Sequence, residues 1–244
     1  MGVDFTPRQI NIALYVQLHE AGYSNEELLE VRHVYRLACK LFNGRYRKTE
    51  KAFICHAVGA ASSMAHFDGS RDLTLAALLH AAYDGGLFPD GRIGGATRAH
   101  RAWLLGEVRP EVEELVFRYG SFEFEAAVPE RILANGVETF DPECLLLALT
   151  HEVDDLADCG LAFAPKYGPE VNARAEVCAE LAVRIGKPDL AETLRRYAKS
   201  YRNLSWMVEG LQTETLHGYH IASNLRGYAR LRRHHFRGSH VELH

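Results

Sequence analysis

The sequence predicts an all-α protein with a single helical domain of 244 residues. Along most of the chain, apolar residues recur at the three- and four-residue spacing of a helix face, as in Leu28, Val31, Val34 and Leu37. No long run alternates apolar β-branched residues with polar ones, so no segment is predicted to form a sheet. Start and stop signals separate the helical stretches, for example the capping pair of Ser24 with Glu27.

These signals place eleven helices along the chain. The first begins with Pro7 behind Thr6, because proline is favoured at the first helical position. The expected ranges are residues 7–22, 24–43, 52–66, 72–83, 96–105, 110–119, 129–135, 143–158, 170–185, 188–209 and 218–236. Two of them, 72–83 and 143–158, are apolar around most of their circumference, which predicts burial on most sides.

Composition excludes several classes of protein. With 47% hydrophobic and 25% charged residues the chain is of ordinary globular type. A net charge of −4 gives no general attraction to nucleic acid, so no nucleic-acid partner is expected. No apolar run is long enough to span a membrane, and no signal peptide is recognised. Five cysteines without a CxxC pair favour a reducing compartment, and hence a cytoplasmic protein.

Three of the thirteen histidines stand out by position. His56, His80 and His151 each lie in a different helix that is expected to be buried. An imidazole is costly to bury unless both ring nitrogens have partners. Imidazole is also a standard ligand of Zn, Mn and Fe ions, so three buried rings are a candidate metal cluster. The alternative is three separate core histidines, each hydrogen-bonded locally.

Four segments around these histidines resemble the alarmone (ppGpp) hydrolases of the HD superfamily. Residues 47–56, R-K-T-E-K-A-F-I-C-H, are similar to the R-K-x-x-x-x-[YF]-I-x-H segment of that family. Residues 75–80, L-A-A-L-L-H, look like its A-A-L-L-H-D signature. Residues 110–116 and 145–158 resemble the segment after the active-site loop and the helix of the last metal ligand. The resemblance implies an HD-like helical core over about residues 28–165, followed by a C-terminal helical extension over 166–244.

The resemblance also implies the metal ligands. His56 and His80 match the family's first two, and the position of its last ligand, an Asp, falls on His151. A shift of three or four residues would choose Asp154 or Asp155 instead. The family's His-Asp dyad is degraded, because Ala81 follows His80. The lost Asp bridges two ions in dinuclear members, so we expect a mononuclear site that holds one divalent ion, Zn, Mn or Fe.

The same comparison suggests the residues around the substrate. Asp84 occupies the Glu position of the family's Glu-Asp pair, and Gly85 replaces the second carboxylate. Asp84 is therefore the candidate general base, although a helix-ending turn would explain it equally well. Arg47 and Lys48 match basic residues that contact nucleotide in the family. With Arg45, and with His100 lining the same cleft, they are expected to bind an anionic small molecule; the alternative for the cations is a solvated loop.

Three functions fit these patterns. The first is an HD-like metal-dependent hydrolase that acts on a small phosphorylated or nucleotide-like substrate through a mononuclear, His-rich site. The second is a catalytically degenerate HD module that binds a small ligand or partner, as the replacements Ala81 and Gly85 suggest. The third is a redox or lyase enzyme with a mononuclear metal on an HD fold. No membrane partner is expected, and the sequence leaves the choice between monomer and homo-oligomer open.

Overall fold

The computed structural model confirms the all-α fold. It describes residues 5–67, 69–122, 124, 128–157, 160–164, 168–202, 211 and 218–220. Within these residues no helix has both the length and the apolar character needed to cross a bilayer. The α-helices are α1 (Asn11–Glu20), α2 (Asn25–Leu41), α3 (Phe53–His66), α4 (Arg71–Leu79), α5 (Ala82–Gly85), α6 (Arg98–Leu105), α7 (Pro110–Gly120), α8 (Val128–Asn135), α9 (Pro142–Ala157), α10 (Gly168–Arg184) and α11 (Pro188–Arg202).

Short elements connect these helices. The 3-10 helices η1 (Val137–Thr139) and η2 (Gly160–Phe163) flank α9 in the sequence. Strands β1 (Arg45–Tyr46) and β2 (Tyr219–His220) pair antiparallel over two residues each. Because residues 219–220 form this strand, the helix expected over 218–236 does not include them. The remainder of that expected helix, residues 221–236, lies outside the described residues, as do residues 203–209 of the expected helix 188–209.

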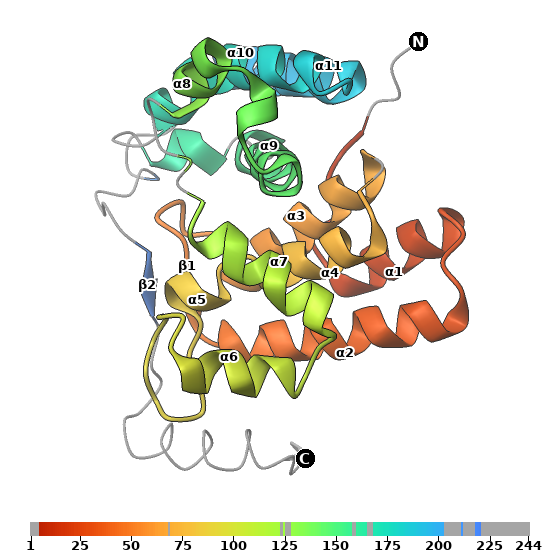
Figure 1. The fold of residues 1–244 in the computed structure, drawn as a ribbon. Coiled ribbons are helices and arrows are strands. Elements are labelled where there is room, and N and C mark those ends of the chain that lie inside the picture. Colours follow the sequence, from red (N-terminus) through yellow and green to blue (C-terminus); the bar gives the residue numbers. More distant parts are fainter. Residues whose placement is uncertain are drawn as a thin grey trace.

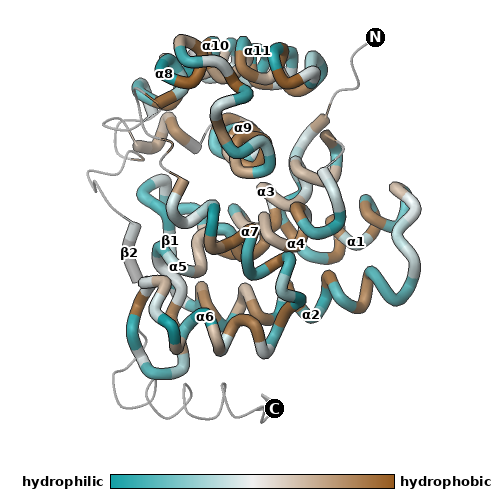
Figure 2. Tube along the Cα trace, viewed as in Figure 1, coloured by the Kyte–Doolittle hydropathy of each residue, from teal (hydrophilic) through white to brown (hydrophobic). Residues whose placement is uncertain are grey.

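The α9 helix lies between two apolar clusters (Figures 1 and 2). Leu147 of α9 packs into a cluster built mainly from α1 to α7, whereas Leu145 and Leu149 pack into a cluster shared with α8, α10 and α11. Figure 1 shows α8, α10 and α11 as a layer on one side of α9, with α3, α4 and α7 on the other. Apolar faces on both sides explain why the α9 sequence is hydrophobic around most of its circumference.

Helix α3 approaches α9 closely because its interior is made of small residues. Ala57, Gly59, Ala60 and Ala61 are all buried. A Cβ atom added at Gly59 would collide with the Asp154 carboxylate of α9. Glycine is unfavourable in the middle of a helix, so its presence here is explained by the space that the carboxylate needs.

The structure corrects two expected helices. The helix expected over residues 72–83 is broken: α4 ends at Leu79, and α5 restarts at Ala82. At the break, the side chain of His80 donates to the carbonyl of Ala77. His80 therefore lies at the end of a helix, where its ring can turn toward α3 and α9.

The first helix begins later than expected. It starts at Asn11, not at Pro7, and its N-cap residue Ile10 makes no side-chain cap. Tertiary contacts hold the preceding segment instead: the Arg8 amide donates to Ser62 Oγ, and the Phe5 carbonyl accepts from the Tyr197 hydroxyl. These contacts override the local preference for a helix. The capping box of Ser24 and Glu27, by contrast, is present as expected.

Gly59→Ala should destabilise the protein, although alanine is the better helix former. We expect a net loss of about 1–3 kcal/mol in the free energy of unfolding, because the added methyl group must displace the buried Asp154 carboxylate. Urea unfolding monitored by circular dichroism measures this loss. Gly120→Ala in α7 is the matched control, since its Cβ would make only an ordinary contact with Tyr83. A Gly59→Ala protein as stable as the Gly120→Ala control would contradict the close approach.

Candidate metal centre

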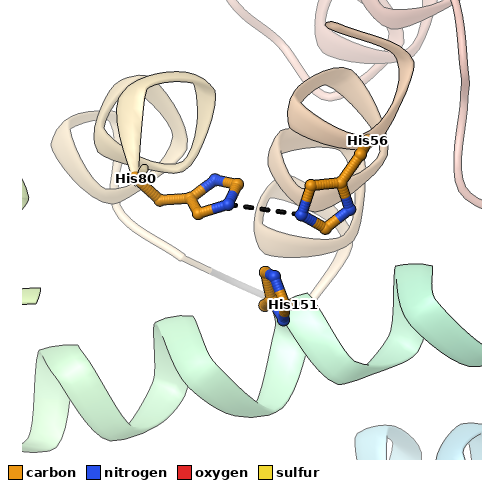
Figure 3. Close-up of side chains that lie close together, drawn as sticks. All are labelled: His56, His80 and His151. Carbon is orange, nitrogen blue, oxygen red and sulfur yellow. Dashed lines mark hydrogen bonds between the residues drawn. The ribbon is translucent and has the colours of Figure 1, made fainter. Parts of the chain in front are cut away.

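Three histidine rings from distant parts of the chain meet in the interior (Figure 3). His56 comes from α3, His80 from the residue after α4, and His151 from α9. Their ring centroids are 4.6 to 5.1 Å apart, and each residue offers a nitrogen within 4.8 Å of the others. The structure thus brings together the three residues that the sequence analysis selected. It shows a buried, His-rich group that could hold a metal ion.

Hydrogen bonds orient the first two rings. The Nδ1 atom of His56 is 2.7 Å from Oδ2 of Asp154, and Nδ1 of His80 is 2.8 Å from the carbonyl oxygen of Ala77. A carbonyl accepts hydrogen bonds, so Nδ1 of His80 carries the proton, and Nδ1 of His56 carries it when that ring donates to Asp154. A guanidinium nitrogen of Arg47 lies 2.8 Å from the same His56 Nδ1, but it can only donate. If Arg47 donated to Nδ1 of His56, the proton of that ring would lie on Nε2 and be donated to Nε2 of His80. Because Arg47 is already paired with both oxygens of Asp155, we assign the hydrogen bond of His56 to Asp154.

This assignment leaves two lone pairs facing each other. The Nε2 atoms of His56 and His80 are 3.2 Å apart, and each lacks a proton when its ring is neutral. Two such acceptors repel each other unless a cation or a proton lies between them. Nitrogen ligands at about 2.05 Å from a tetrahedral Zn ion are about 3.3 Å apart, which is close to the separation found here. The separation of the two nitrogens is therefore compatible with two ligands of one metal ion.

The protein disfavours a proton at this place. Burial is the main cause that lowers the pKa of each ring: to about 4 for His80, to about 3 for His151, and well below the ordinary value for His56. The positive charge of Arg47 lowers all three further. Neutral imidazoles are the form that binds metal, so the three rings are in the protonation state that a metal ligand needs.

The third ring, His151, also has carboxylates beside its Nδ1. Oδ2 of Asp155 lies 3.9 Å away and Oε1 of Glu152 lies 4.0 Å away. One nitrogen of His151 faces the gap between the other two rings in Figure 3. His56 and His80 thus have an acceptor within hydrogen-bond distance of Nδ1, the usual arrangement for a histidine that binds metal through its other nitrogen, whereas the carboxylates beside His151 lie farther away. The side chain of His151 is 17% exposed, so the three-histidine group is accessible to solvent at this residue.

The alternative ligands Asp154 and Asp155 are engaged with cations. Both oxygens of Asp154 lie within 3.0 Å of the Lys51 ammonium group, and Gln9 donates to Oδ1. Asp155 pairs with Arg47 through both of its oxygens. Burial raises the pKa of Asp155, but the charge and hydrogen bond of Arg47 together with the neighbouring imidazoles outweigh it, so the pKa is lowered and the carboxylate stays ionised. A set of His56, Asp154 and Asp155 is also close enough to hold an ion. These cation contacts favour the three histidines as ligands.

The predicted substrate-binding cations have different surroundings. Arg47 points inward to Asp155. Lys48 is partly buried, and burial followed by the neighbouring Arg47 charge lowers its pKa to about 8. Arg45 lies over the ring of Phe53, 4.2 Å from its centroid, and reaches the carboxylate of Asp84 at 3.3 Å.

The described contacts of Asp84 and His100 are with residues other than His56, His80 and His151. The Asp84 side chain is 74% exposed at the end of α5, and its described partner is Arg45. His100 is buried against Phe88 and bonds to Asp90 and to the Gly95 carbonyl, so it holds the loop before α6. The general-base role of Asp84 and the cleft-lining role of His100 stay predictions.

Several neighbours of the site were not selected from the sequence. Lys51 neutralises Asp154, and Arg174 of α10 pairs with Glu152 through two hydrogen bonds of 2.6 and 3.1 Å. Tyr119 of α7 stands edge-on to His80, with ring centroids 6.0 Å apart. Lys51 lies in the same basic segment as Arg47, and this position in the sequence could have been used to select it. The pairing of Glu152 with Arg174 depends on how α9 packs against α10, which no local pattern reveals.

No family model matches the chain, and no curated protein matches it. The structure supports the resemblance at a coarser level: the fold is helical, and it contains a buried His-rich group. Assignment to the HD superfamily rests on the four sequence segments alone.

The metal-free protein should lose stability on acidification partly through His80. Its folded pKa of about 4 lies below the 6.5 of an ordinary histidine, so between these values the unfolded chain binds more protons. The contribution of His80 is complete above pH 6.5 and is lost as the pH falls toward 4; it is on the order of 3 kcal/mol. Urea unfolding in EDTA between pH 7 and pH 4 measures it.

The variant His80→Gln isolates this contribution. Its free energy of unfolding should fall less steeply with acidification than that of the wild type, whatever its value at pH 7. His19→Gln, at an exposed position in α1, is the matched control and should keep the wild-type slope. Equal slopes for His80→Gln and the wild type would show that His80 is not held neutral.

Proposed function

We propose that this protein is a metal-dependent hydrolase that holds one divalent ion with His56, His80 and His151. Its substrate would be a small phosphorylated, nucleotide-like anion. One observation carries the proposal: the Nε2 atoms of two buried imidazoles lie 3.2 Å apart, and both are unprotonated when the two rings donate through Nδ1 to Asp154 and Ala77. With that assignment, two neutral rings with only structural roles would place two acceptors against each other, whereas two ligands of one cation would not.

A site with three protein ligands is of the catalytic type. Structural zinc sites are closed by four ligands, whereas catalytic sites keep a position open for water or substrate. A divalent ion held here would lower the pKa of water to near neutrality and polarise a phosphoryl oxygen. The chain supplies the orientation: Asp154 and Ala77 fix two of the rings, and partly exposed His151 marks the side open to substrate.

The charge balance favours an anionic substrate. The carboxylates nearest the rings are each paired with a cation: Asp154 with Lys51, Asp155 with Arg47, and Glu152 with Arg174. Neutral histidines add no negative charge, so an ion would keep its full double charge. Lys48 lies next to Arg47 in a partly desolvated position, and an anion beside it would favour its charged form. The site as a whole therefore attracts a phosphate.

Two features support a second candidate, a degenerate module that binds an anion without turnover. Ala81 stands where the HD family has a metal-binding Asp, and Gly85 stands where it has a second carboxylate. A single ion with three neutral ligands would still bind a phosphorylated ligand. Turnover separates this candidate from the hydrolase, and iron in protein purified without air would favour the redox or lyase alternative.

The wild-type protein should bind about one equivalent of Zn²⁺ and become more stable. Zinc at a hundred times its dissociation constant should raise Tm by roughly 5–10 °C for a chain of this size. His80→Ala should abolish this shift, because it removes one of the two facing nitrogens. Differential scanning calorimetry and elemental analysis measure the effect.

His19→Ala is the control for surface binding, since His19 is exposed. A zinc-dependent Tm shift that persists in His80→Ala, or one lost equally in His19→Ala, would refute the proposed centre. Release of inorganic phosphate from a panel of nucleotides and sugar phosphates by the loaded wild type then separates the hydrolase from the binding module.

Binding of a phosphorylated ligand should weaken above pH 8 because Lys48 loses its proton there. Its pKa of about 8 means that the ammonium charge is present below this pH and fades above it. Lys48→Arg should keep its charge throughout and remove the dependence, since a guanidinium stays protonated. Inhibition of turnover by inorganic phosphate, measured from pH 7 to 9.5, tests this. If wild type and Lys48→Arg weakened in parallel, Lys48 would not be the group that binds the anion.

A further inference from the structure

The guanidinium of Arg45 has an unusual environment. Its Nη1 atom is buried, and among the described residues it has no hydrogen-bond partner. Its Nη2 atom reaches Asp84 at 3.3 Å. Buried donors of charged groups are almost always paired, because leaving one unpaired is costly. Burial is also the main cause that lowers the pKa of Arg45, so the carboxylate of Asp84 only partly compensates the charge.

Gly85 makes this placement possible. A Cβ atom at position 85 would collide with Nη1 of Arg45. The HD family has a carboxylate at this position, according to the resemblance described above. Its replacement by glycine opens the space in which the guanidinium lies, so the missing side chain and the position of Arg45 are linked.

Arg45 is also connected to the histidines. Its guanidinium stacks on Phe53, whose ring centroid is 5.4 Å from that of His56 and 6.0 Å from that of His80. Arg45 is thus one aromatic ring away from the candidate metal centre. Asp84, by contrast, projects into solvent, and an ion pair with such an exposed partner is weak and easily exchanged.

We propose that Arg45 binds a phosphate group of the substrate and that Asp84 is an internal competitor that occupies Arg45 until the substrate replaces it. The inference rests on the proposed function, because it names the residue that recognises the substrate anion. In this exchange the weak contact with Asp84 is lost. The phosphate then accepts charge-assisted hydrogen bonds from the planar guanidinium, including Nη1 once the side chain turns toward the ligand. No covalent bond changes.

Titration calorimetry with inorganic phosphate and with pyrophosphate tests the exchange in the zinc-loaded full chain. Asp84→Asn should bind these anions about two- to fivefold more tightly, since the competing ion pair is gone. Arg45→Met should bind them roughly tenfold more weakly or worse. Gly85→Ala should weaken binding in the same direction as Arg45→Met while it keeps the charge, because its methyl group displaces the guanidinium.

Glu180→Gln and Arg184→Met are the matched controls. These residues form an exposed ion pair of 3.2 Å on α10 and undergo the same charge changes away from the site. Both should bind phosphate as the wild type does. Weaker or unchanged binding in Asp84→Asn, or wild-type binding in Arg45→Met, would overturn the proposal. So would equal effects in the controls.

Turnover distinguishes this role of Asp84 from that of a general base. An internal competitor can be removed without loss of kcat, so Asp84→Asn should keep kcat and lower KM. Loss of kcat by a factor of 100 or more would assign the base role instead and overturn the competitor role. Elemental analysis and phosphate titration of the metal-free protein keep the two proposals separate. A chain that holds no metal refutes the hydrolase, while the order of phosphate affinities among the variants still decides the role of Arg45.

Discussion

The buried carboxylate of Asp154 is the constraint on which the rest of the structure depends. A charge with no exposed surface is tolerated only when surrounding donors compensate it. Here they come from three segments far apart in sequence: Gln9 before α1, Lys51 before α3, and His56 within α3. The carboxylate thereby fixes the N-terminal segment and α3 against α9. It also requires glycine at position 59, and its contact with Nδ1 favours the tautomer of His56 on which the proposed metal site rests.

Local sequence signals located most helices but did not locate the junctions between them. Helical periodicity and capping residues are properties of neighbouring residues, so helices such as α2, α7 and α10 were located to within a few residues. The late start of α1 was missed because it depends on contacts with distant parts of the chain. The break at His80 was also missed, although the contact of its ring with the Ala77 carbonyl is local. The histidines were selected because a polar side chain in an otherwise apolar helix can be buried only when it has hydrogen-bond or metal partners. Their partners could not be selected, since the contacts of Asp154 and the pairing of Glu152 with Arg174 arise only when α9 packs against α3 and α10.

Ala81 stands where the HD family, which the sequence segments resemble, has a metal-binding Asp; this difference would change the electrostatics of the proposed site and need not abolish it. An anionic ligand would lower the net charge of a bound divalent ion, whereas three neutral imidazoles leave it unchanged. The acidic groups around the rings act instead as hydrogen-bond acceptors and are themselves balanced by Lys51, Arg47 and Arg174. A more positive centre is a stronger Lewis acid and binds anions more tightly. The departure from the motif is therefore compatible with phosphate chemistry at one ion.

The second departure from the motif, Gly85, has a structural consequence of its own. If position 85 had simply lost its carboxylate through relaxed selection, the space would be expected to fill with ordinary apolar packing. Instead it contains the guanidinium of Arg45, a desolvated cation with an unpartnered nitrogen. Burying such a group costs free energy that the stacking on Phe53 and the contact with exposed Asp84 offset only in part. An anion of higher charge would offset more of it. The proposed recognition of a substrate anion by Arg45 would therefore account for both the glycine and the unpaired donor.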